Sequence, residues 1–191
     1  RFKKIVVWIY SNLMKARQYH IGLAPGEIGR YVLLVEDPDS ARVISQFLDN
    51  AKEVANHREY LSYSGTFKGV PITAISIGMG GPPAAIAIEE LAAIGAEVFI
   101  FLGASRSLSN EFLVVTGAVR DEGTGLQYTP MEIPALADVE VSAFLEQVCS
   151  EKKLDFQVGI VHSRDAYYRV GYSKDAESKN LANKTYSGVC G

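Results

Sequence analysis

Residues 71–103, PITAISIGMGGPPAAIAIEELAAIGAEVFIFLG, decide the fold class of this chain. The stretch begins with an apolar run from Ile72 to Ile77 and ends with another from Glu97 to Leu102, both of strand length. Between them lie a glycine turn, residues 78–81, and a segment rich in alanine and isoleucine that opens at Pro82–Pro83, as helices often do. The order strand, helix, strand predicts a βαβ unit with parallel strands.

The glycine turn allows several interpretations. Glycines before a helix let backbone N–H groups approach an anion closely. A dinucleotide-binding fingerprint has a similar turn, but its third glycine would fall at Pro83, and no acidic residue ends the second strand, where Leu102 and Gly103 stand. A tight turn without any ligand is the third interpretation of this segment taken alone.

The composition predicts one α/β domain. Of the 191 residues, 48% are hydrophobic and 21% charged, which suits a chain with one sizeable core. A formal net charge of -3 provides no broad basic field, so nucleic acid is not expected as a partner and small-molecule chemistry is favoured. Two cysteines, Cys149 and Cys190, make no disulfide framework or zinc-ligand spacing, so we expect a cytoplasmic protein without a metal.

The first 17 residues, RFKKIVVWIYSNLMKAR, place basic residues before a short apolar run. That run, Ile5 to Tyr10, is interrupted by Ser11 and Asn12 and is far shorter than the ~20 residues of a membrane span. No small-residue cleavage pattern follows it. We therefore expect no secretion signal and no membrane partner. Residues 1–17 are expected to be an N-terminal extension that either packs on the domain or is not part of the native sequence.

Upstream of the central stretch, Tyr31 to Val35 is a continuous apolar run typical of a buried strand. Asp37 can cap a helix whose first residue is Pro38. The residues expected on one face of that helix are Val43, Ile44, Phe47 and Leu48. The segment that follows alternates like two antiparallel strands joined at Lys68–Gly69.

Downstream, residues 112–119 and 156–161 are predicted strands, and residues 120–138 read as a long surface or active-site loop. Asp138 can cap a further helix. The residues expected on its buried face are Val141, Phe144, Leu145 and Val148. Residues 169–191 follow neither periodicity.

This element order predicts a three-layer α/β/α sandwich around a central mixed sheet. No internal repeat and no Pro- or Ser-rich linker divides the chain, so residues 1–191 are expected to form a single domain, with residues 1–17 as an extension and residues 169–191 as a tail without an assigned structure.

Five segments between Gln18 and Tyr168 together resemble the nucleoside phosphorylase family, which includes uridine phosphorylase and the hexameric bacterial purine nucleoside phosphorylases. They are QYHIGL, DPDSARVISQFLDNAKEVANHREY, SIGMGGPPAAIAIEELAAIGAEVFI, AVRDEGT with PMEIPALAD, and HSRDAYY. The resemblance implies phosphorolysis of a nucleoside to free base and ribose 1-phosphate. It implies inorganic phosphate as co-substrate and neither a metal nor an organic cofactor. The VRDEGT loop favours uridine narrowly over purine nucleosides.

The resemblance also implies roles for particular residues. His20 matches the histidine that reaches the ribose 5'-hydroxyl in a neighbouring subunit, and Arg58 matches the arginine lent to the neighbour's phosphate. Ser105 falls in the turn between phosphate, ribose and base. Arg106, which stands where the family has a glycine, is a further candidate for phosphate binding. Tyr167 matches the aromatic residue that stacks on the base. A homo-oligomer, dimer to hexamer, is therefore expected, and no catalytic residue is identified.

Three positions at the phosphate site depart from the family pattern, and Ala104 also stands where the family has a threonine. Glu36, Ser40 and Phe101 stand where the family has a glycine and two arginines that admit and bind phosphate. The late acidic segment that grips the ribose hydroxyls has no counterpart in these residues. The sequence leaves three classes open: a nucleoside phosphorylase, a non-catalytic relative that binds nucleosides or serves in storage or interaction, and an unrelated α/β binding domain.

Overall fold

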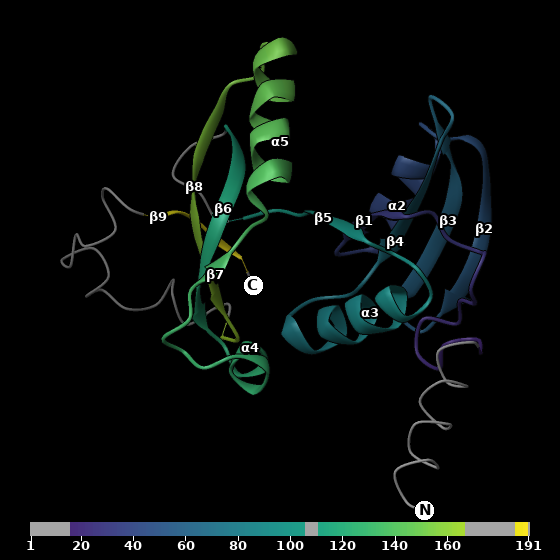
Figure 1. Cartoon of the computed structure of the whole chain (residues 1–191), viewed down its shortest axis with the longest axis horizontal. Coiled ribbons are helices and arrows are strands. Elements are labelled where there is room, and N and C mark those ends of the chain that lie inside the picture. The colour runs from purple at the N-terminus through teal and green to yellow at the C-terminus, as the bar shows by residue number, and fades with distance from the viewer. Residues whose placement is uncertain (1–15, 106–110, 167–185, 191) are drawn as a thin grey trace, which may run out of the picture. The chain divides into compact units, whose positions relative to one another are not determined.

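The computed structural model describes residues 16–105, 111–166 and 186–190. The chain divides into two compact units, Arg1–Gly103 and Ala104–Gly191, whose elements are drawn in Figure 1. Most of the expected N-terminal extension and of the tail lies outside the described residues. The single-domain organisation therefore stays a prediction.

A mixed five-stranded sheet in the order β2-β3-β4-β1-β5 forms the first unit. Its strands are β1 Tyr31–Val35, β2 Asp49–His57, β3 Tyr60–Phe67, β4 Val70–Ser76 and β5 Val98–Leu102. Strand β1 runs parallel to both β4 and β5, whereas β2, β3 and β4 are antiparallel neighbours. The three strands predicted at residues 31–35, 72–77 and 97–102 are confirmed to within two residues at their ends.

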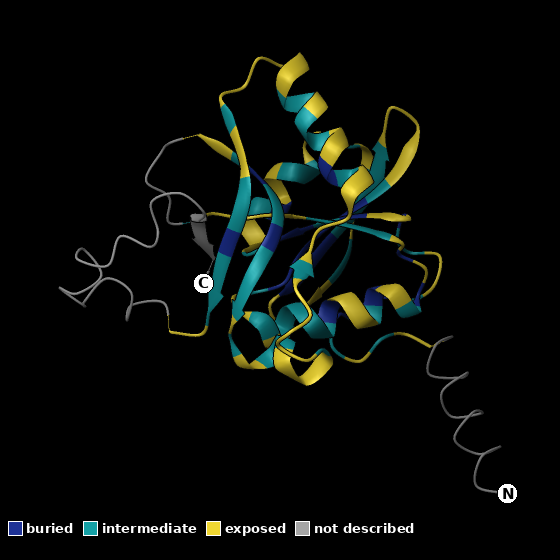
Figure 2. Ribbon diagram, turned by 60° about the vertical axis from the view of Figure 1, so that its left-hand side comes forward, coloured by how far each residue is buried: buried dark blue, intermediate teal, exposed yellow. Residues whose placement is uncertain are grey.

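Helices cover the two faces of this sheet. Helix α3, Gly81–Ala93, buries Ala87 and Leu91 in the main core. The other fully or nearly fully buried members of that core include Ile21, Leu23, Val32, Leu34, Tyr60, Ile75 and Ile77, and Figure 2 colours buried positions dark blue. Because side chains alternate along a strand, the buried Ala74 and Ser76 face the opposite side, where helix α2, Pro38–Ser45, packs on β3 and β4. The predicted α/β class with helices flanking a mixed sheet is confirmed.

The hairpin predicted at Lys68–Gly69 is present between β3 and β4. Both turn residues have positive φ, 50° and 81°, as a two-residue type I' turn requires. The segment before it, however, is two strands, since β2 ends at His57 and the chain reverses through Arg58, whose φ is 59°. An arginine rarely adopts this backbone conformation, so no turn signal marked the break in the sequence.

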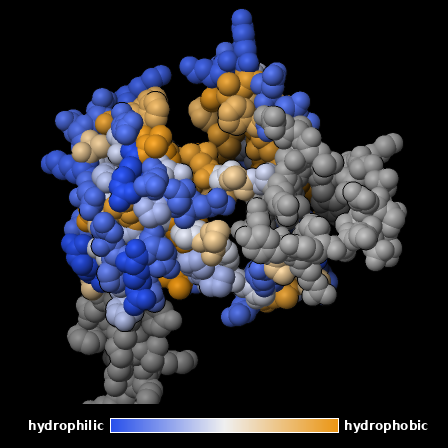
Figure 3. Space-filling view, turned by 180° about the vertical axis from the view of Figure 1, so that it is seen from behind, coloured by the Kyte–Doolittle hydropathy of each residue, from blue (hydrophilic) through white to orange (hydrophobic). Residues whose placement is uncertain are grey.

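The prediction for the inner face of α2 is only partly right, because Ile44 and Leu48 are half-buried but the other two residues are not. Val43 and Phe47 are 53% and 71% exposed, and the helix ends at Ser45, before Phe47 is reached. The buried residue is Ala41, whose small side chain lets this short helix lie close to the strands. Figure 3 shows apolar side chains, in orange, among the hydrophilic ones at the surface.

The predicted cap of α2 is confirmed, because Asp37 Oδ1 accepts a hydrogen bond of 2.8 Å from the Ser40 backbone N–H. The hydrogen bond from the Ser40 hydroxyl, followed by that from the Ser40 N–H, lowers the pKa of Asp37. We expect Asp37→Ala to reduce the free energy of unfolding by about 1 kcal/mol at neutral pH. A carboxylate whose pKa is lower in the folded state stabilises the fold fully at pH values above its unfolded-state pKa. This contribution is lost as the pH falls through the folded-state pKa.

Urea unfolding of wild type and Asp37→Ala at neutral and acidic pH checks this expectation. The difference between the two proteins should shrink as the pH falls. Asp39→Ala is the matched control, because the Asp39 carboxylate is exposed and pairs with Arg42 at 2.6 Å, and exposed pairs of this kind contribute little. Equal losses from both substitutions would contradict the assigned cap.

The second unit has a four-stranded sheet in the order β7-β6-β8-β9. Its elements are β6 Phe112–Asp121, α4 Gly123–Tyr128, β7 Ala135–Leu136, α5 Val139–Glu151, β8 Phe156–Arg164 and β9 Tyr186–Cys190. Strand β8 is parallel to β6 and to β9, and β7 is antiparallel to β6. The strands predicted at residues 112–119 and 156–161 are confirmed and are each longer, and β9 lies in the tail that the sequence left without a structure.

The predicted loop at residues 120–138 contains both α4 and β7, so it is more regular than expected. Arg120 organises it: the guanidinium donates hydrogen bonds to the carbonyl oxygens of Gly125, Thr129, Pro130 and Ile133. Through these contacts Arg120 binds residues up to 13 positions away in the sequence. The periodicity of the sequence does not reveal such contacts.

Helix α5 begins at the predicted cap, since Asp138 Oδ1 accepts from the Val141 N–H at 3.0 Å. Its predicted inner face is only partly right. Phe144 is 61% exposed, and the one buried residue of the helix is Ser142. The helix packs on β6 through this small residue, which turns Phe144 outward.

Candidate functional site

Glu36, Phe101 and Gly103 meet at the carboxyl edge of the parallel strands of the first unit. Glu36 follows β1 and Gly103 follows β5, which lies beside it in the sheet. A Cβ added to Gly103 would lie 2.5 Å from the tip of the Phe101 ring and 3.3 Å from Glu36 Oε1, so both side chains lie close to this glycine. Two of the three departures from the family pattern at the phosphate site are therefore neighbours, at the edge where open α/β sheets bind ligands.

The glycine turn lies at the same edge, between β4 and α3. Gly78 and Gly80 have φ of 71° and 90°, in the left-handed region that favours glycine. Gly80 is the N-cap of α3 and makes no side-chain cap hydrogen bond, and the first turn of the helix contains no acidic residue. The backbone geometry is compatible with an anion, as the sequence indicated.

The Arg58 turn lies against the glycine turn. The Ser76 hydroxyl, at the end of β4, donates to the Glu59 carbonyl at 2.5 Å, and a Cβ on Gly78 would lie 3.3 Å from the Glu59 side chain. The Arg58 guanidinium stands over the Tyr19 ring, 5.7 Å from its centroid. The reversal of the chain at Arg58 therefore brings this predicted phosphate ligand to the edge that carries the glycines.

Tyr60 ties this region to α3. Its side chain is buried, and its hydroxyl donates to the Pro83 carbonyl at 3.1 Å. Burial, followed by the negative charges of Glu59 and Glu90, raises the pKa of Tyr60 to about 12. Tyr60 therefore stays a protonated hydrogen-bond donor throughout the physiological range.

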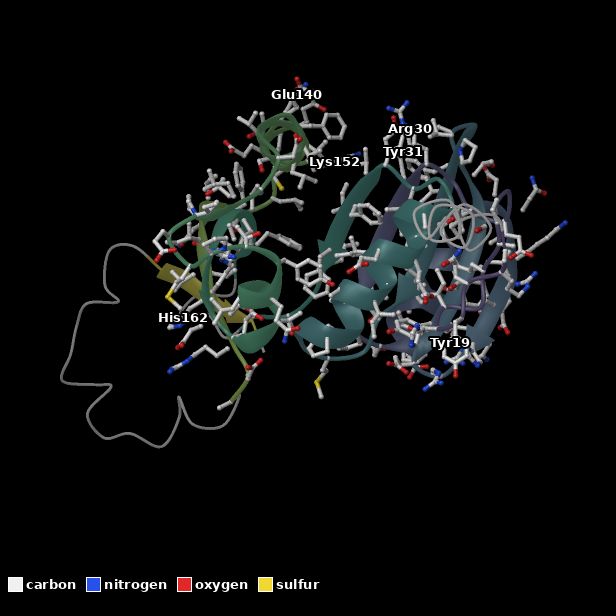
Figure 4. All side chains as sticks on the ribbon, turned by 60° about the horizontal axis from the view of Figure 1, so that its bottom comes forward. Tyr19, Arg30, Tyr31, Glu140, Lys152 and His162 are labelled. Atoms are coloured by element: carbon white, nitrogen blue, oxygen red, sulfur yellow. The ribbon has the colours of Figure 1, made fainter. Side chains whose placement is uncertain are left out.

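His20 is held next to Arg58. Its ring contacts the Tyr19 ring edge-to-face, with the centroids 4.9 Å apart, so both predicted residues adjoin Tyr19. His20 Nδ1 lies 2.6 Å from Glu90 Oε1, and the His20 carbonyl accepts a hydrogen bond of 2.7 Å from His57 Nδ1. Figure 4 shows Tyr19 on the side of the first unit away from Arg30 and Tyr31, which mark the start of β1.

The structure does not test the other predicted site residues. Ser105 is half-buried and belongs to the second unit. Arg106 and Tyr167 lie outside the described residues, so their roles stay predictions. The sequence pattern did not point to Tyr19 or Glu90, although the two glutamates in the otherwise apolar helix AIAIEELAAIG were a signal that α3 meets a polar partner.

The second unit has a charged cluster of its own at the carboxyl ends of β6 and β8. Asp121 Oδ2 lies 3.1 Å from His162 Nε2 and 3.0 Å from Arg164 Nε. Asp165 Oδ2 accepts a hydrogen bond from the Gly123 N–H at 3.0 Å. The sequence analysis did not single out these residues; His162 is labelled in Figure 4.

No three or more His, Cys, Asp and Glu side chains among the described residues are grouped so that they could hold a metal ion. No helix in the part of the chain that the structure describes is both long and apolar enough to cross a membrane.

The family model of the phosphorylase superfamily matches residues 30–188. The chain belongs to this superfamily, the family of nucleoside phosphorylases that its motifs resemble.

Three relatives show the degree of similarity. Uridine phosphorylase from Thermococcus kodakarensis is 45% identical over 156 residues, covering 79% of this chain and 56% of the relative. Uridine phosphorylase from Treponema pallidum is 38% identical over 156 residues, with 79% and 60% covered. Guanosine phosphorylase from Halorubrum lacusprofundi is 31% identical over 173 residues, with 87% and 72% covered.

The fold agrees with a solved structure of the same family. The crystal structure of uridine phosphorylase from Vibrio fischeri ES114 has a TM-score of 0.84 at 28% identity, covering 92% of this chain and 74% of that one. The chain spans 56% and 60% of the first two relatives, less than two thirds of their length.

Proposed function

We propose that this protein is a nucleoside phosphorylase, which uses inorganic phosphate to cleave a nucleoside into free base and ribose 1-phosphate. The observation that carries the proposal is the match of the family across residues 30–188, with relatives named uridine phosphorylase and guanosine phosphorylase. Uridine is the preferred substrate in this proposal, because the relatives at 45% and 38% identity are uridine phosphorylases.

The geometry of the first unit supports a shared site. His20 and Arg58 adjoin the same tyrosine, although 38 residues separate them in the chain. The family roles of both are performed in a neighbouring subunit, so the proposal includes a homo-oligomer, a dimer at least.

Ser105 and Arg106 are assigned to phosphate, and Ser105 and Tyr167 to the nucleoside. Positioning and charge supply the catalysis, without a metal or an organic cofactor. The low cysteine content favours the cytoplasm.

A second candidate is a non-catalytic relative that binds nucleosides or serves in storage or interaction. Glu36 is the observation that favours it, since its carboxylate occupies the edge of the sheet where the family admits phosphate. A carboxylate opposes a phosphate dianion, which weakens the step that a phosphorylase requires.

The deciding experiment incubates the purified protein with uridine, inosine and adenosine, with and without phosphate, and measures the free base released. The proposed function predicts phosphate-dependent release, fastest from uridine. Nucleoside binding in calorimetry without base release would favour the non-catalytic relative. The absence of both nucleoside binding and base release would contradict the proposed function and would leave, of the second candidate, only the storage or interaction role.

A further inference from the structure

Glu90 is the most heavily engaged carboxylate near the predicted site. It lies on α3 with a side chain only 15% exposed. Oε2 accepts from the backbone N–H groups of Ile21 at 2.9 Å and of His20 at 3.1 Å, and Oε1 lies 2.6 Å from His20 Nδ1. Three N–H donors thus converge on one carboxylate, and such charge-assisted bonds are stronger than neutral ones.

His57 binds the backbone carbonyl of His20. A carbonyl oxygen can only accept, so the 2.7 Å contact between His57 Nδ1 and the His20 carbonyl is an N–H donated by His57. The backbone N–H, the carbonyl and the ring Nδ1 of His20 are therefore all engaged, by residues 70 and 37 positions away. Among the described contacts, the ring Nε2 is the one polar atom of His20 without a recorded partner.

The contact with Glu90 also decides which ring nitrogen carries the proton. An ionised carboxylate only accepts hydrogen bonds, so His20 Nδ1 must be protonated. In the neutral ring, Nε2 then has a lone pair and accepts a hydrogen bond from a hydroxyl. The Tyr19 ring meets the His20 ring edge-to-face, and the His20 side chain is still 36% exposed.

We propose that Glu90 is a positioning residue that holds His20 in the Nδ1–H tautomer, with Nε2 presented as a hydrogen-bond acceptor for the 5'-hydroxyl of a nucleoside. His57 assists by fixing the backbone of His20. The identity of that hydroxyl rests on the proposed function, whereas the tautomer does not. The alternative role for Glu90 is purely structural: it would fasten the segment that contains the buried Ile21 to α3.

Nitrogen NMR of histidine rings tests the tautomer without any substrate. The chain has three histidines, so His57→Asn and His162→Asn assign the His20 signals. At about pH 8.5, two units above the ordinary histidine pKa, we expect protonated Nδ1 and unprotonated Nε2 in wild-type His20. Glu90→Leu should move the ring toward the Nε2–H tautomer, and Glu90→Gln, which keeps one accepting oxygen, should give an intermediate spectrum.

Glu89→Leu and Glu89→Gln are the matched controls, because Glu89 is the exposed neighbour on the same helix, and they should leave the His20 signals unchanged. An Nε2–H tautomer in the wild type would overturn the proposal before any variant is made. An Nδ1–H tautomer that persists in Glu90→Leu would also overturn it. If Glu90→Leu does not fold, Glu90→Gln decides, and a spectrum identical to wild type counts against the proposal.

A kinetic comparison distinguishes the positioning role of Glu90 from a purely structural role. The ratio of kcat/KM for uridine to that for 5'-deoxyuridine measures the contribution of the 5'-hydroxyl. Glu90→Gln should lower this ratio roughly two- to tenfold, the range of one hydrogen bond, and a structural role would lower both values equally and leave the ratio unchanged. If the wild-type protein releases no base, this result counts against the proposed function. The tautomer of His20 is then decided by the NMR measurement without the kinetic comparison.

Discussion

Replacing Glu36 with glycine is expected to lower the phosphate concentration for half-saturation by about ten- to a hundredfold. The Glu36 carboxylate lies at the carboxyl edge of β1, against Phe101 and Gly103. Two like unit charges about 5 Å apart repel by about 3 kcal/mol at an effective dielectric constant near 20. That energy corresponds to roughly a hundredfold in affinity, and screening by salt reduces it.

Phosphate titration by calorimetry measures this effect directly. Glu36→Gln removes the charge and keeps the volume, so it should give most of the gain if repulsion is the cause. If space is the cause, only Glu36→Gly should improve binding. Glu97→Gln is the control, since this carboxylate precedes β5, at the opposite end of the strand, and pairs with Arg30 at 2.7 Å.

Two further substitutions extend the test toward the family pattern. Ser40→Arg and Phe101→Arg, added to Glu36→Gly, supply the two missing cations and should raise affinity again. If neither of the two Glu36 variants nor the triple variant binds phosphate better than wild type, the carboxyl edge of β1 and β5 is not the phosphate site. This outcome would favour the non-catalytic candidate.

Leu91→Ala is expected to reduce the free energy of unfolding by about 2–5 kcal/mol, the largest loss we predict for a single substitution in this chain. Leu91 is fully buried in the core between α3 and the sheet. Its truncation removes apolar contacts and leaves a cavity in the core cluster to which Ile21 and Ile75 also belong. Much of a total stability of 5–15 kcal/mol, typical of such domains, would be lost.

Ile88→Ala is the matched control on the same helix, because Ile88 is 38% exposed and loses a side chain of the same size. We expect it to cost less than half as much as Leu91→Ala. Urea unfolding followed by circular dichroism gives both values. Equal losses would mean that α3 does not pack with Leu91 inward.

The sequence by itself determined the elements with a strong local pattern. The apolar runs around residues 31–35, 72–77 and 97–102, and the glycines and prolines between the last two, predicted the parallel strands and the helix α3 where the structure has them. Caps at Asp37 and Asp138 were readable because the cap hydrogen bond spans only three residues. The motifs in the same segments also pointed to the family.

Burial was predicted less well where a helix packs through a small residue. The apolar periodicity of α2 and α5 pointed to Val43, Phe47 and Phe144, which are exposed. The sheet instead receives Ala41 and Ser142, because small side chains allow the closest approach of helix and strand. Periodicity reports that a face is apolar, and only the packing decides which residue lies inside.

Tertiary structure alone decided the contacts between distant segments. Gly29 has no turn signal, yet a Cβ there would lie 2.5 Å from the Pro71 carbonyl oxygen, so the close approach of these two backbone segments requires glycine. Likewise, Glu90 meets His20 across 70 residues, and Arg58 reaches Tyr19 only because the chain reverses at a positive φ. Local propensities act over a few residues, whereas these positions are set by the docking of α3 and of residues 18–23 on the folded sheet.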